Sequence, residues 1–180
     1  MDFSECVATR RSVRHFKGQP VARELVERIV AAAAFAPSWK NAQSARYIAV
    51  LDEALRGRIA RECVMGYERN RVIIEGAPLL IVMTYVAGRS GFERDGGFST
   101  SKGAHWESFD AGIAAQTFCL SAWNEGLGSV ILGIFDEQKV IEAVGVPAGQ
   151  KVAALIALGY PDETPPMPRR KDAHEILTFI

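Results

Sequence analysis

The densest positive patch of the chain is the run RRSVRHFK at residues 10–17. Arg10 and Arg14 share a face if this segment is helical or turned, because residues four apart are neighbours on a helix. Their like charges repel, so an anion between them is one reason to tolerate the arrangement. Ser12 adds a hydroxyl donor, and the planar fork of arginine suits phosphate. The run therefore indicates an anion site or, alternatively, the solvated basic end of an N-terminal helix.

A second basic cluster, Arg169-Arg170-Lys171, follows a proline-rich stretch near the end of the chain. Proline stiffens a segment and can hold such a cluster in place. A solvated tail is the other interpretation. The two basic clusters could converge on one phosphate, although their spacing in the sequence does not show this by itself.

A third candidate is a polar loop that begins where Pro37 ends a predicted helix. Ser38, Asn41 and Gln43 could form hydrogen bonds to the edge of a heteroaromatic ring. Trp39 could border the same ring. The alternative is an ordinary capped loop.

Other sequence motifs that would indicate a specific kind of site are not present. The Gly-Leu-Gly sequence at 126–128 is no dinucleotide fingerprint, because position 131 holds isoleucine and the expected order is helix–turn–strand. His105, Glu107 and Asp110 cannot all lie on one helix face. We therefore expect them to be solvent-facing polar residues at a helix start rather than metal ligands.

Hydrophobic periodicity predicts the elements that must position these residues. Expected helices cover residues 2–10, 21–36, 53–65, 106–125 and 137–144, and expected strands cover residues 47–51, 79–85, 129–133, 152–159 and, at the tail, 175–180. Residues 88–103 hold five glycines and predict a long loop, either a lid or disordered. Helices and strands mix without strict βαβ alternation, which favours an α+β fold.

Length and composition limit the class of protein. The 180 residues predict a single domain, 1–180. The charges balance at 21 against 21, which argues against a nucleic-acid partner. The longest apolar run, residues 77–87, is too short for a membrane helix, and the N-terminus has no secretory signal. Three widely spaced cysteines indicate reduced thiols and a cytoplasmic protein.

Five segments, taken in order, resemble the nitroreductase family of flavoprotein oxidoreductases. They are residues 10–16, 36–43, 110–116, 126–136 and 157–161. The resemblance implies an α/β/α sandwich with a central mixed, mainly antiparallel sheet. It also implies a domain-swapped homodimer with one FMN at each subunit interface, in which residues 177–180 form the exchanged strand.

The same resemblance implies a set of cofactor-binding residues. Arg10, Ser12 and either Arg169 or Arg170 correspond to phosphate ligands, and Arg14 to the cation beside the pyrimidine edge of the flavin. The remaining residues of the expected site are Arg11 beside the phosphate ligands, Leu132 and Gly133 near flavin N5, and Pro37, Ser38, Trp39, Asn41 and Gln43 reaching from the other subunit.

The implied activity is electron transfer from NAD(P)H through FMN to a nitroaromatic, a quinone or a similar small acceptor by a ping-pong route. The flavin carries the hydride chemistry, so no catalytic side chain and no metal are expected. Two alternatives stay open. One keeps the fold with other flavin chemistry, such as dehalogenation, ene reduction or flavin breakdown. The other is a flavin-binding sensor or carrier without turnover.

Overall fold

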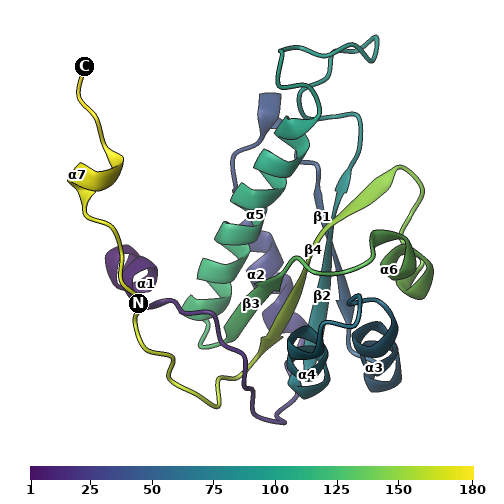
Figure 1. Ribbon diagram of the computed structural model, residues 1–180, viewed down its shortest axis with the longest axis vertical. Coiled ribbons are helices and arrows are strands. Elements are labelled where there is room, and N and C mark those ends of the chain that lie inside the picture. The colour runs from purple at the N-terminus through teal and green to yellow at the C-terminus, as the bar shows by residue number, and fades with distance from the viewer.

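A four-stranded antiparallel sheet forms the centre of the computed structural model, which describes residues 1–180 (Figure 1). The strands lie in the order β1 (Ala45–Val50), β2 (Leu79–Val86), β4 (Gln150–Gly159) and β3 (Gly128–Leu132). Ile156 of β4 lies opposite Ile81 of β2 and Ile131 of β3. The parallel component is limited to one bridge, between Ser12 and Ser129 at the β3 edge.

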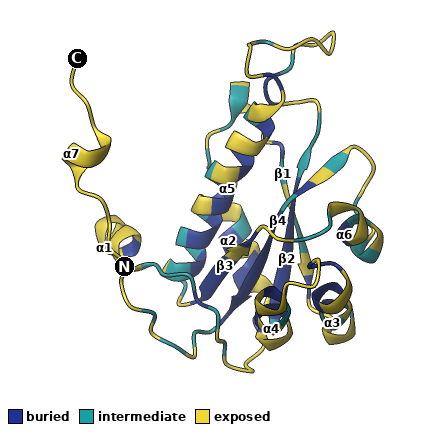
Figure 2. Cartoon of the chain, viewed as in Figure 1, coloured by how far each residue is buried: buried dark blue, intermediate teal, exposed yellow.

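Helices cover both faces of the sheet, which confirms the α/β/α sandwich (Figure 2). Successive side chains of a strand point to opposite faces, so β2 serves two cores. Its Ile81 and Met83 belong to the core formed with α2 (Arg23–Ala33) and α5 (His105–Asn124). Its Leu80 and Val82 belong to the core formed with α3 (Glu53–Glu62), α4 (Glu68–Gly76) and α6 (Glu137–Val144).

Aspartate side chains cap the starts of three of the helices. In α1 (Phe3–Thr9), the Asp2 carboxylate accepts from the Glu5 backbone N–H at 2.8 Å. Asp52 does the same for α3, and Asp136 for α6. Such caps satisfy backbone donors that a helix leaves unpaired. They confirm that a helix follows each of these aspartates.

The sequence patterns do not predict α4. Asn70, a polar residue, is buried in this helix, whereas the apolar Val72 is half exposed. Polar residues are usually exposed and apolar residues usually buried. Because these two positions do the opposite, the sequence of this helix lacks the hydrophobic period of an amphipathic helix. Asn70 is buried because its side-chain amide donates to the carbonyl oxygen of Ile134 at 3.1 Å.

The strand predicted at residues 175–180 does not form in the protomer. Glu175 and Ile176 lie in α7 (Ala173–Ile176), where Asp172 and Glu175 form a capping box that favours a helical turn. The last four residues follow this turn, and α7 stands away from the sheet and its helices (Figure 1). Their exchange with a second subunit stays a prediction. No helix of the chain combines the length and apolar character of a membrane span.

Candidate functional site

The basic segment 10–17 follows the edge of the sheet in an extended form. The helix α1 ends at Thr9, so the expected shared helical face of Arg10 and Arg14 does not form. Instead the Val13 N–H donates to the Ser129 carbonyl oxygen at 3.1 Å. Gly128 permits this approach, because a Cβ atom there would come within 2.6 Å of the Val13 side chain.

Four polar side chains of this segment form no hydrogen bond or ion pair in the protomer, and among them are Arg10 and Ser12, the two that the resemblance makes phosphate ligands; the others are His15 and Lys17. The Arg11 guanidinium donates to the carbonyl oxygens of Ala8 and Arg10, which places it at the end of α1. The Arg14 guanidinium forms one hydrogen bond, to the Ser12 carbonyl oxygen at 3.1 Å. The segment therefore carries positive charge that no acidic side chain of the protomer pairs with, and a hydroxyl group that forms no hydrogen bond.

The C-terminal segment joins this site through Glu163, which the sequence patterns do not indicate. Its carboxylate accepts from the backbone N–H groups of Arg14 at 2.5 Å and His15 at 3.2 Å. Arg169 and Arg170 are exposed and form no hydrogen bond or ion pair. The structure thus brings the chain beyond β4 to Arg14, but it does not bring either arginine to Arg10.

The predicted polar loop holds itself in a compact turn. The Ser38 hydroxyl oxygen accepts from the Gln43 N–H at 2.9 Å, and the Gln43 side chain donates to Asn41 at 3.1 Å. Trp39 and Asn41 bound a short 3₁₀ turn, η1 (Trp39–Asn41). Pro37 lies outside α2, which ends at Ala33. This loop is therefore an ordered part of the molecule.

Two carboxylates on the first turns of α5 are buried, so the expectation that they face solvent is wrong. Glu107 is 3% exposed and accepts from the Gly88 N–H at 2.6 Å. Asp110 is 5% exposed and accepts from the Trp39 N–H at 2.8 Å and the Ser90 hydroxyl at 2.5 Å. Backbone donors from two loops compensate their burial. No group of three or more His, Cys, Asp or Glu side chains is arranged to hold a metal ion.

Aromatic side chains gather where these two loops meet α5. The ring centroids of Trp39 and Trp106 are 4.8 Å apart, and those of Trp106 and Phe109 are 5.3 Å apart. Lys102 lies 5.3 Å from the Trp106 ring. The glycine-rich segment 88–103 contributes Phe92 and Phe98, whose rings are 5.0 Å apart. These rings form an apolar surface at the end of α5.

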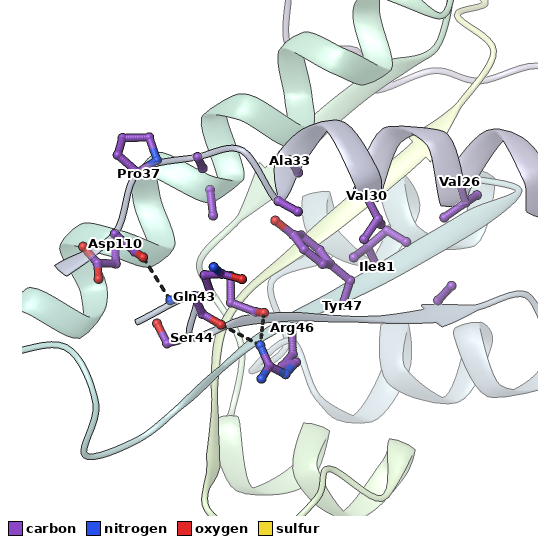
Figure 3. A pocket seen from close by; sticks show the side chains of 16 residues that line it. Val26, Val30, Ala33, Pro37, Gln43, Ser44, Arg46, Tyr47, Ile81 and Asp110 are labelled. Atoms are coloured by element: carbon purple, nitrogen blue, oxygen red, sulfur yellow. Dashed lines mark hydrogen bonds between the residues drawn. The ribbon is translucent and has the colours of Figure 1, made fainter. Parts of the chain in front are cut away.

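A pocket of about 360 Å³ lies beneath the polar loop, between α2, β1 and α5 (Figure 3). Its walls are mainly apolar, and the Tyr47 hydroxyl points toward Ala33 of α2. That hydroxyl is buried without a partner. Burial, and secondarily the nearby Cys119, raises the pKa of Tyr47 to about 12, so the phenol is neutral at physiological pH. Asp110 lies at the same end of the pocket as Pro37 (Figure 3).

The end of β3 completes the arrangement. Leu132 is buried as the last residue of the strand, and Gly133 is the exposed residue after it. The Asn70 amide holds the next turn through Ile134. Segments far apart in the sequence thus fix the backbone at residues 132–134.

The Nitroreductase family model matches residues 7–160. The chain belongs to the nitroreductase family. The match spans the basic segment, the polar loop and all four strands, so the recognition made from short motifs is confirmed over most of the chain.

Individual members of the family resemble the chain over most of its length. The 5,6-dimethylbenzimidazole synthase of Rhodospirillum rubrum is 30% identical over 172 residues, which cover 88% of this chain and 82% of that protein. The NADH dehydrogenase of Thermus thermophilus is 29% identical over 186 residues, covering 91% and 88%. The solved NADPH:FMN oxidoreductase of Vibrio harveyi, complexed with NAD+, is 25% identical with a TM-score of 0.80, covering 98% and 76%.

Proposed function

We propose that this protein is an FMN-dependent oxidoreductase that takes electrons from NAD(P)H and passes them to a nitroaromatic, a quinone or a similar small acceptor. The observation that carries the proposal is the unpartnered pair of Arg10 and Ser12 beside β3 in a chain of the nitroreductase family. The names of the Thermus thermophilus and Vibrio harveyi relatives support a nicotinamide donor, and the latter supports FMN.

The free donors of the basic segment fit the phosphate of FMN. Arg10 offers a planar fork and Ser12 a hydroxyl, which are suitable partners for a phosphate dianion. Arg11 would add positive charge beside them. Arg169 or Arg170 would join them once the tail is folded against a partner subunit, since neither forms a hydrogen bond or ion pair in the protomer.

The remaining residues of the proposed site serve the flavin ring. Arg14 would place its charge beside the pyrimidine edge, because only one of its N–H groups is used within the protomer. The ring would lie near the backbone of Leu132 and Gly133. The other subunit would contribute the polar loop, namely Pro37, Ser38, Trp39, Asn41 and Gln43.

When bound, FMN supplies the acceptance and donation of a hydride. The residues of the chain then need only bind, orient and shield. Arg14 stabilises negative charge at a fixed place, which costs no reorganisation during the reaction. The aromatic surface of Trp39, Trp106 and Phe109 excludes water. No side-chain acid or base is required for this chemistry.

Exposed apolar side chains support the homodimer in this proposal. Phe109 on α5 is 57% exposed, and Phe179 in the tail is 90% exposed. Phe3 on α1 is also exposed. Burial of each of these side chains against a second copy would be favourable. A second copy that covers them would also bring its polar loop to the flavin of the first.

A second candidate function keeps the fold and changes the reaction. The Rhodospirillum rubrum relative is named as a synthase, not as a nicotinamide oxidoreductase. Its 30% identity is similar to that of the Thermus thermophilus protein. Steady-state turnover distinguishes the two candidates. Oxidation of NAD(P)H that requires a nitroaromatic or quinone supports the oxidoreductase. Parallel lines in double-reciprocal plots would indicate its ping-pong route. FMN-loaded protein that shows no such oxidation supports the second candidate or a carrier.

The charge of Arg14 gives a prediction for the reduction potential of the bound flavin. Arg14→Ala removes a cation that favours the anionic reduced form, so the potential is expected to fall. Loss of one charge-assisted interaction of about 1.5–3 kcal/mol corresponds to roughly 30–60 mV for a two-electron couple. Spectroelectrochemical titration measures the shift, and Arg14→Lys, which keeps the charge, serves as the control. An unchanged potential in Arg14→Ala contradicts the role assigned to this residue.

A further inference from the structure

Three residues of the polar loop have a backbone conformation that side-chain-bearing residues rarely adopt. The φ angles of Lys40, Asn41 and Gln43 are 43°, 56° and 47°. Asparagine tolerates this region, whereas Lys40 and Gln43 are strained in it by their own Cβ atoms. Such strain persists only where surrounding contacts hold it, and it concentrates at functional sites. The contacts that hold this loop therefore matter for whatever the loop does.

Several hydrogen bonds of the loop are internal and do not attach it to the rest of the domain. Those from Gln43 go to Ser38 and Asn41, and the Ala42 N–H donates to the Trp39 carbonyl oxygen at 2.7 Å. Another, from the exposed Arg46 guanidinium to the Gln43 carbonyl oxygen at 2.7 Å, reaches only to β1. The Lys40 Nζ atom also lies 2.9 Å from a carboxylate oxygen of Glu93, outside the loop. These two side chains are 61% and 48% exposed, and exposed ion pairs contribute little.

Asp110 provides the buried attachment. A single carboxylate oxygen, Oδ2, accepts from the Trp39 N–H and from the Ser90 hydroxyl. Ser90 is fully buried, and its hydroxyl lies 3.4 Å from that of Ser44, where the loop enters β1. Hydrogen bonds to an ionised acceptor are stronger than neutral ones. One residue of α5 thus ties together the polar loop and the start of segment 88–103.

We propose that Asp110 is a positioning residue for the flavin site: it holds the strained polar loop in the form that reaches the flavin of the other subunit. This inference rests on the proposed function, because it takes the polar loop as part of the flavin site. Asp110 itself does not touch the flavin. It acts through the Trp39 backbone, and through Ser90 it makes the two loops one unit.

Glu107 offers a matched control on the same helix. It is as deeply buried as Asp110 and also accepts a backbone N–H from a loop, that of Gly88. It forms no contact with the polar loop. Loss of a buried carboxylate in general would therefore affect both positions, whereas loss of the loop attachment would affect only Asp110.

The experiment measures FMN affinity and backbone protection in the full-length chain. Apoprotein of the wild type, Asp110→Ala, Asp110→Asn and Glu107→Ala is titrated with FMN by fluorescence quenching, and melting temperatures show which variants are folded. Asp110→Asn keeps an acceptor oxygen and remains measurable if Asp110→Ala does not fold. Hydrogen exchange of the Trp39 amide reports the attachment without any flavin.

We expect a graded result. The dissociation constant for FMN rises about tenfold in Asp110→Ala, about threefold in Asp110→Asn and less than about twofold in Glu107→Ala. Exchange of the Trp39 amide accelerates in the same order. An affinity in both Asp110 variants equal to that of the wild type, or an equal loss in Glu107→Ala, overturns the inference. A wild-type chain that does not bind FMN overturns the proposed function instead, and Trp39 exchange then still shows whether the attachment exists.

Discussion

We expect Arg10→Ala to weaken the proposed binding of FMN by about 10- to 100-fold. The side chain of Arg10 has no partner in the protomer, so its removal costs the fold little. A hydrogen bond between arginine and a phosphate is charge-assisted and contributes about 1.5–3 kcal/mol. The loss therefore falls on the dissociation constant for FMN, which isothermal titration calorimetry of the apoprotein measures.

Lys17→Ala is the matched control for Arg10→Ala. Lys17 carries the same charge in the same basic segment, and its backbone is fixed by a hydrogen bond to the Tyr160 carbonyl oxygen at 2.9 Å. Its side chain is exposed and has no assigned role in the site. Equal losses in both variants would mean that only the overall charge matters, which contradicts a phosphate site at Arg10.

Removal of residues 175–180 is expected to dissociate the proposed homodimer at low micromolar concentration. Leu177, Phe179 and Ile180 are exposed in the protomer, and burial against a partner would stabilise each by about 1.5–3 kcal/mol. Loss of only two of these contacts, about 3–6 kcal/mol, corresponds to a dimer dissociation constant raised by roughly 10²- to 10⁴-fold. Sedimentation velocity over a concentration series measures this constant.

A substitution in the same segment distinguishes the effect of losing apolar contacts from the effect of shortening the tail. Phe179→Ser keeps every residue of the chain and removes one of its most exposed aromatic side chains. It is expected to weaken the dimer less than the truncation does. A truncated chain that sediments as a dimer at low micromolar concentration would show that the tail is not the exchanged strand.

Local sequence patterns predict most helices and strands of this fold, but they do not predict how these helices and strands are arranged in space. The stripe of Leu25, Val26 and Ile29 predicts α2, and the limits of α6 agree with those expected. The order of the strands depends on pairing between distant segments, which no local pattern records. The helix α4 escapes detection because the polar Asn70 is buried by a single long-range hydrogen bond.

The residues of the candidate site are also predictable only where the evidence is local in the sequence. The residue types of the basic segment and the polar loop indicate that both could bind a ligand, which stays a prediction; in the protomer the side chains of Arg10 and Ser12 form no hydrogen bond. Asp110 is missed, because a carboxylate near a helix start looks alike in the sequence whether it faces water or a loop 71 residues away. Glu163 is missed for the same reason, since its partners Arg14 and His15 lie at the other end of the chain.

The visible spectrum of the purified protein, before and after anaerobic addition of NADH or NADPH, shows whether this chain is an FMN-dependent NAD(P)H oxidoreductase. We expect a yellow protein, or one that becomes yellow when FMN is added to the apoprotein. We also expect at least one of the two nucleotides to bleach the colour and a nitroaromatic or quinone to restore it. A chain that stays colourless with FMN contradicts the flavin site. A yellow protein that neither nucleotide bleaches contradicts the NAD(P)H-dependent oxidoreductase.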